Sequence, residues 1–144
     1  MTTPHQKLAS LANFLDDLPH RRFHMPKWVS EDHSDTHCGT AACACGWAAT
    51  IFHKEGWTFG ELSVRYGEQS GAEAFADFFH LSHDDAWLIT TNFMNYCHRF
   101  GVMAERVTPH MAAEVIRDVL RRIDPDSLES PATVEVAHLV GGAS

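Results

Sequence analysis

The spacing of apolar residues along the chain predicts a mainly helical protein. Apolar side chains that recur every three or four residues lie on one face of an α-helix, and such a face packs into a core. This pattern, or a helix-start signal, is present in residues 3–18, 40–52, 71–80, 83–94 and 108–123. We therefore expect one compact bundle of about five helices over residues 1–144, with residues 141–144 frayed.

Four of these segments open with residues that favour a helix start. Thr3-Pro4 and Thr108-Pro109 each place a threonine at the N-cap and a proline in the first turn. Ser70-Gly71-Ala72-Glu73 has the capping-box pattern, and Ser82-His83-Asp84-Asp85 repeats it. In a capping box the serine hydroxyl accepts a hydrogen bond from a backbone N–H of the first turn, so both serines are expected to do this.

Two shorter segments alternate apolar with polar or small residues, which is the period of a β-strand. The alternation is seen in residues 57–69 and again in residues 134–140. We expect a short hairpin in the first segment and a short C-terminal strand in the second. Residues 19–37 form a long polar connector, and connectors of this length in a compact domain are often functional.

Composition and charge narrow the classes of partner. The chain has a formal net charge of −8 and a pI near 5.7. Nucleic-acid surfaces attract basic proteins, so nucleic-acid binding is not expected, whereas a basic protein surface would be attracted. No apolar run reaches the roughly 18 residues of a membrane helix, and no signal-peptide pattern opens the chain. We therefore expect a cytoplasmic protein with reduced cysteines and no membrane contact.

The most unusual stretch is residues 35–50, which hold three of the four cysteines and His37, with His33 two residues before them. Residues 40–52, which overlap the second part of this stretch, are mostly small or apolar and include no proline. The run is longer than a typical strand, so a buried helix is expected. The stretch is therefore the predicted functional site.

A reactive thiol is the first chemistry that this stretch suggests. The positive end of a helix dipole lowers the pKa of a thiol placed there, and Cys38 lies at the expected helix start. Cys38 is therefore the candidate nucleophile, with His37 as its base and backbone N–H groups as an oxyanion hole. Cys43 and Cys45 are expected to be packed core thiols. Other candidate bases are His33, His53, His98 and His138.

A structural zinc ion is the second chemistry. Zinc prefers four nitrogen or sulfur ligands in a tetrahedron, and the chain has eleven histidines. The candidate ligands are His33, His37, Cys38 and Cys45, with Cys97 and His98 as replacements for two of them. No other cofactor is expected, because the sequence has no glycine-rich phosphate loop and no dinucleotide fingerprint.

Three segments carry a resemblance to a group of small uncharacterised bacterial and phage proteins. Residues 22–28 have the pattern Arg-Phe-x-Met…Trp, residues 38–47 have Cys-Gly-Thr-x-x-Cys-x-x-Gly-Trp, and residues 81–86 have Leu-Ser-x-x-x-Ala. The match spans roughly residues 20–123, and it implies that the cysteine motif matters without implying an activity. Residues 38–42 are also similar to the Cys-Gly-x-Ala opening of the nucleophile helix in papain-like and bacteriocin-processing cysteine peptidases, which implies a nucleophilic cysteine.

The leading functional hypothesis is an accessory protein of the phage or mobile-element type that binds or inhibits a host protein. Small size, acidity, a helical build and the resemblance together favour it over the thiol enzyme and the zinc protein. In this interpretation the cysteine motif is structural. Arg21, Arg22 and Trp28 in the polar connector are the candidate partner-binding residues, because arginine and tryptophan are typical anchors of protein interfaces.

Overall fold

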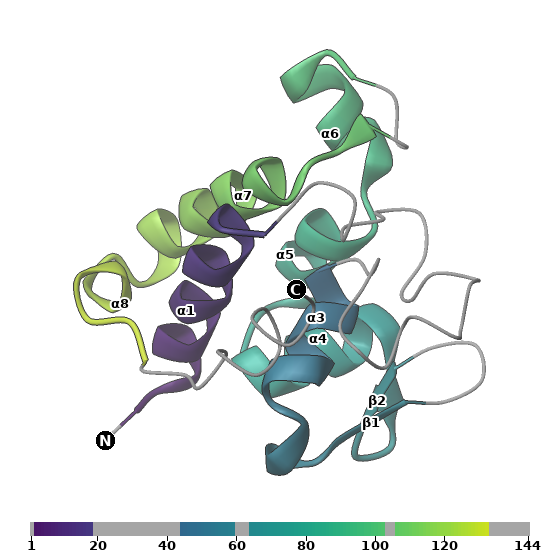
Figure 1. The fold of residues 1–144 in the computed structure, drawn as a ribbon, viewed down its shortest axis with the longest axis vertical. Coiled ribbons are helices and arrows are strands. Elements are labelled where there is room, and N and C mark those ends of the chain that lie inside the picture. The colour runs from purple at the N-terminus through teal and green to yellow at the C-terminus, as the bar shows by residue number, and fades with distance from the viewer. Residues whose placement is uncertain (1, 19–43, 60–63, 103–105, 133–144) are drawn as a thin grey trace.

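The computed structural model describes residues 2–18, 44–59, 64–102 and 106–132, and all structural statements below concern these residues (Figure 1). They form seven α-helices, one 3₁₀ helix and a small three-stranded sheet, which confirms the expected mainly helical fold. In chain order the elements are α1 (Pro4–Asp16), α3 (Ala44–Ile51), the 3₁₀ helix η2 (His53–Glu55), β1 (Trp57–Phe59), β2 (Val64–Tyr66), β3 (Gln69–Ser70), α4 (Gly71–Phe79), α5 (His83–Thr90), α6 (Phe93–Phe100), α7 (Pro109–Ile123) and α8 (Asp126–Glu129).

The two longest helices, α1 and α7, pack along each other and form one side of the core (Figure 1). Both begin as predicted, because the hydroxyls of Thr3 and Thr108 accept hydrogen bonds from the backbone N–H groups of Gln6 and Met111. Their apolar stripes are buried as the spacing predicts. The buried stripe residues are Leu8, Leu11 and Leu15 on α1 and Ala112, Val115, Ile116, Val119 and Leu120 on α7.

Helix α3 lies in the middle of the molecule and contacts α1, α4, α5 and the sheet. It holds the C-terminal part of the cysteine-rich stretch, and its residues 44–49 are all buried. The expected buried helix over residues 40–52 is thus confirmed for residues 44–51. Residues 40–43, where that helix was expected to start, lie outside the described part of the chain.

The predicted hairpin is present and extends into a third strand. Strands β1 and β2 pair antiparallel with Trp57 opposite Tyr66, and β2 pairs antiparallel with β3. The rings of Trp57 and Tyr66 both contact the ring of Phe78 on α4, at centroid distances of 5.4 and 5.0 Å. This aromatic contact fixes the sheet against α4. Residues 134–140, where a C-terminal strand was expected, lie outside the described residues.

One predicted helix boundary was wrong, and one short helix was not predicted. The segment 83–94 is not one helix, because α5 ends at Thr90 and α6 begins at Phe93. Asn92 is the cause, since its side chain accepts a hydrogen bond from the N–H of Asn95 at 3.1 Å and caps a new helix. The turn-rich segment 124–132 contains the short helix α8, which was not predicted.

The two capping-box patterns behave differently. The Ser82 hydroxyl accepts a hydrogen bond from the Asp85 N–H at 3.1 Å, as predicted. The Ser70 side chain makes no capping hydrogen bond, so that prediction was wrong. The residue after Ser70 is Gly71, which adopts a positive φ of +57°, a backbone conformation that glycine tolerates without strain.

Candidate functional site

Most of the site residues predicted from the sequence lie outside the described residues. This holds for the proposed nucleophile and base, Cys38 and His37, and for His33 of the zinc set. It holds equally for the partner-binding candidates Arg21, Arg22 and Trp28. Of the alternative bases, His53 and His98 are described and both are exposed, whereas His138 is not described.

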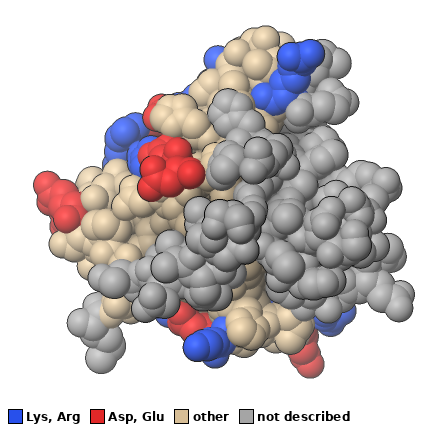
Figure 2. All heavy atoms as spheres, in the orientation of Figure 1, with Lys and Arg blue, Asp and Glu red and all other residues tan. Residues whose placement is uncertain are grey.

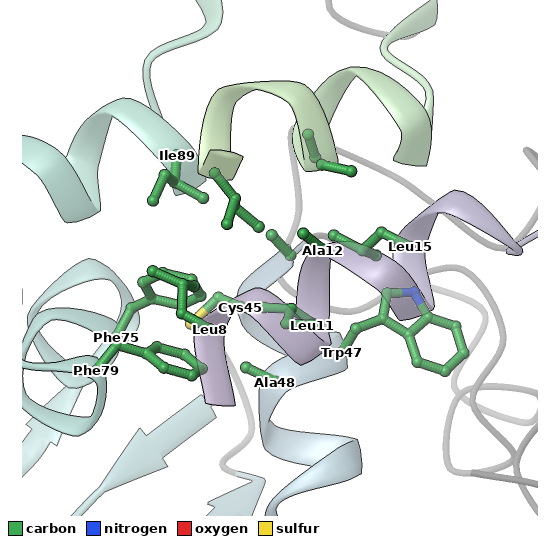
Figure 3. Close-up of a cluster of buried hydrophobic side chains, with 14 of the residues drawn as sticks. Leu8, Leu11, Ala12, Leu15, Cys45, Trp47, Ala48, Phe75, Phe79 and Ile89 are labelled. Carbon is green, nitrogen blue, oxygen red and sulfur yellow. The ribbon is translucent and has the colours of Figure 1, made fainter. Parts of the chain in front are cut away.

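Cys45 is the described cysteine of the motif, and it lies in the core. Its side chain is fully buried among apolar residues of α1, α3 and α4, including Leu8 and Phe75 (Figure 3). Its thiol donates a hydrogen bond to the Gly71 carbonyl oxygen at a sulfur–oxygen distance of 3.4 Å. The expectation that Cys45 is a packed core thiol is therefore confirmed.

The described residues do not assemble a metal centre. No three His, Cys, Asp or Glu side chains in this part of the chain are grouped closely enough to hold a metal ion. Cys45 is buried at the centre, whereas the half-buried Cys97 and the exposed His98 belong to α6 at one end of the molecule (Figure 1). Cys45, Cys97 and His98 therefore do not form a zinc site by themselves.

Among the described residues, an open hollow lies at the corner between α4 and α5. Its volume is about 450 Å³, which is within the range of small-ligand pockets. The residues that line it are Gln69, Glu73, Ala76, Asp77, His80, Leu81 and His83. They come from β3, from one face of α4 and from the turn into α5, so three elements shape this hollow.

The corner depends on an unusual backbone conformation at His80. This residue ends α4 in the left-handed region, with φ at +55°, and its N–H bonds to the Ala76 carbonyl. The His5 ring braces the same corner, with Nε2 at 3.2 Å from the His80 carbonyl oxygen and Nδ1 at 2.8 Å from the Asp124 carboxylate. The start of α1 therefore contacts the rim of the hollow, and Asp124 at the end of α7 orients the His5 ring.

The hollow carries two carboxylates on its α4 side, those of Glu73 and Asp77. Glu73 and Asp77 are one helical turn apart, so they lie on the same face of α4. Both are exposed, and neither forms an ion pair with any residue that the structure describes. Acids on α5 and α7 differ, since Asp85 pairs with Arg122 and Asp118 pairs with Arg99 and Arg121.

An exposed tryptophan continues the surface beyond the hollow. Trp87 on α5 is 43% exposed, and it lies four residues after His83, which lines the hollow. Residues four apart share a helix face, so Trp87 follows His83 along α5. We call the surface formed by Glu73, Asp77, His83, Asp84 and Trp87 the α4–α5 face.

A second cluster of charged residues has a structural role. Acidic and basic side chains meet where α1 packs on α7 (Figure 2). Asp16 at the end of α1 accepts hydrogen bonds from Arg117 and from His110 Nδ1, the latter at 2.7 Å. Partial burial alone would raise the pKa of Asp16, but the hydrogen bonds and charges of Arg117 and His110 lower it below its ordinary value. The charged groups of this cluster pair with one another across α1 and α7, so the cluster joins the two helices.

Sequence reasoning missed the hollow, although part of its signal was present. Glu73 and Asp77 have the spacing of neighbours on a helix face, and Trp87 falls off the buried stripe of α5 that Ala86 and Ile89 form. What the pattern cannot show is the left-handed turn at His80, which sets the direction of α5 relative to α4.

Comparison and hydropathy add two findings. No helix within the described ranges is long and apolar enough to cross a membrane. No protein-family model, curated protein or solved structure matches this chain.

Proposed function

We propose that this chain is a small acidic accessory protein that binds a basic segment of a protein partner on its α4–α5 face. The observation that carries the proposal is the hollow lined by Glu73 and Asp77, whose carboxylates form no ion pair within the described ranges. A lysine or arginine side chain entering this hollow would meet two carboxylates on one helix face. The net charge of −8 would also speed the approach of a basic partner.

The shape of the surface supports a protein partner. An acidic hollow beside an exposed aromatic ring combines a charged subsite with an apolar anchor, and tryptophan is common among the residues that dominate interface energies. Nucleic acid fits poorly, because its phosphates would be repelled by these carboxylates. The resemblance adds the expectation of a phage or bacterial accessory role, in which the partner is a host protein. We place the protein in the cytoplasm, where thiols stay reduced.

A binding experiment with matched charge variants tests the proposal. The probe is a short peptide of alternating glycine and lysine, titrated against the full chain by NMR or isothermal calorimetry. We expect the Glu73→Gln/Asp77→Asn variant to lose several-fold in affinity, because two carboxylates that contact the peptide are removed. We also expect binding to weaken with added salt, as for any exposed charge pair.

The matched control removes the same charge elsewhere. Asp126 and Glu129 on α8 are exposed, and neither forms an ion pair within the described residues. The Asp126→Asn/Glu129→Gln variant has the same net charge as the hollow variant. If both variants weaken binding equally, only overall charge matters and the hollow is not a site. If neither the lysine peptide nor an arginine peptide of the same length binds, the proposal is wrong.

A further inference from the structure

We infer that the α4–α5 face selects arginine over lysine in its partner, with Trp87 and Asp84 forming the subsite. This inference rests on the proposed function, since it names the side chain that the basic segment presents. Asp84 and Trp87 are three residues apart on α5 and therefore neighbours on one helix face. Both are exposed. A guanidinium group can stack on the indole of Trp87 and pair with the carboxylate of Asp84 at once.

The two residues are available to a partner. Among the described residues, Asp84 forms no ion pair, whereas its neighbour Asp85 turns to Arg122 on α7. The Trp87 ring makes no aromatic or cation–π contact within the same part of the chain. The opposite face of α5 packs into the core, because Ala86 and Ile89 are buried.

The chemistry of the pair favours a planar cation. Arginine stacks flat on an indole ring and still presents N–H groups at its edge to a carboxylate. Lysine carries the same charge, but its ammonium is compact and strongly hydrated, so it gains less from the ring. The surface also disfavours a second copy of this chain as occupant, because both copies would bring a net charge of −8.

Two peptides of equal charge separate this inference from the proposed function. The probes are the alternating glycine–lysine peptide and a glycine–arginine peptide of the same length, each titrated against the full chain. Both have the same long-range attraction to an acidic protein, so any difference reports on stacking and on hydrogen-bond geometry. We expect the arginine peptide to bind about threefold more tightly, which is typical of an exposed cation–π contact.

Variants then assign the difference to the subsite. Trp87→Leu keeps an apolar side chain but removes the π face, and it should abolish the preference while leaving lysine-peptide affinity nearly unchanged. Asp84→Asn should weaken the arginine peptide more than the lysine peptide. Ile123→Leu is the control, because Ile123 is another exposed apolar residue, 37% exposed, at the end of α7. It should change neither affinity.

The outcomes are distinct. Equal affinity for the two peptides, or a preference that survives in Trp87→Leu, overturns the arginine subsite and leaves the proposed function standing. Failure of both peptides to bind removes the proposed function as well. Circular dichroism of each variant shows whether the fold is intact, and Trp87→Phe, which keeps an aromatic face, should retain most of the preference.

Discussion

The Cys45 thiol on α3 donates a hydrogen bond to the carbonyl oxygen of Gly71, the first residue of α4. This bond joins α3, which holds the C-terminal part of the cysteine-rich stretch, to α4, the helix that carries Glu73 and Asp77. Cys45 itself is fully buried, in a cluster with Leu8 and Phe75. A thiol with this environment contributes to packing and holds the start of α4 in place.

The burial of Cys45 predicts strong protection from alkylation. Iodoacetamide can reach this sulfur only when the core opens, whereas Cys97 on α6 is half-buried. We expect Cys45 in the native protein to react at least about tenfold more slowly than Cys97. Peptide-resolved mass spectrometry measures both rates in one sample. In denaturant the two rates should become similar, and native rates that are already equal would contradict the burial of Cys45.

The helices that could be predicted from the sequence are those decided by local pattern. The stripes of α1 and α7 follow from apolar residues at helical spacing, and their threonine caps need only residues three positions away. The break at Asn92 was missed because a side-chain cap there competes with continuation of the helix, and both are compatible with the sequence.

The hollow could not be predicted, because it depends on contacts between distant segments. Its corner requires the positive φ of His80. His5 at the start of α1 contacts that corner, and Asp124 at the end of α7 contacts His5. The cysteine stretch was identified by composition alone, and composition does not say where a side chain points. Burial of Cys45 follows from the position of α3 against four other parts of the fold.

The contrast between Ser82 and Ser70 predicts different costs for the same substitution. Ser82→Ala removes the hydroxyl that accepts a hydrogen bond from the Asp85 N–H. This substitution should lower the free energy of unfolding by about 1 kcal/mol. Ser70→Ala removes no capping bond and should change it by less than about 0.5 kcal/mol. Chemical denaturation of the two variants beside the parent chain gives both values. Equal losses would mean that Ser70 caps α4 in solution.

The indole of Trp57 offers a test of a buried polar group. Trp57 is 2% exposed, and its Nε1 has no hydrogen-bond partner among the described residues. A buried unsatisfied donor costs about 1–3 kcal/mol, which offsets the packing lost when the smaller phenyl ring replaces the indole. We therefore expect Trp57→Phe to change the free energy of unfolding by no more than about 1 kcal/mol.

Trp57→Ala is the matched comparison for that variant. It removes the ring contacts with Tyr66 and Phe78 and leaves a cavity between the sheet and α4. The expected loss is about 3–5 kcal/mol, measured by the same denaturation experiment. If Trp57→Phe costs as much as Trp57→Ala, the indole N–H makes a favourable interaction, and the interpretation of Nε1 as unsatisfied is wrong.

The lowered pKa of Asp16 predicts a pH-dependent contribution to stability. In the folded protein the pKa of the Asp16 carboxyl lies below its ordinary value of 3.8. As pH falls, the unfolded chain therefore takes up this proton before the folded protein does. The contribution is therefore fully present above that ordinary value and is lost as pH falls through the lower, folded pKa. Near neutral pH, Asp16→Asn should reduce the free energy of unfolding by up to about 1 kcal/mol, because the group is partly exposed.

The difference between the parent chain and Asp16→Asn should shrink when urea denaturation is repeated in steps below pH 4, since the parent carboxyl is then protonated too. A double-mutant cycle with Arg117→Gln shows whether Arg117 is the cause, because it donates to Asp16 from the facing helix. In that background the effect of Asp16→Asn near neutral pH should be smaller. If the difference stays constant through the acid range, ionisation of Asp16 does not contribute to the free energy of unfolding. The contact of Asp16 with α7 would then act through packing alone.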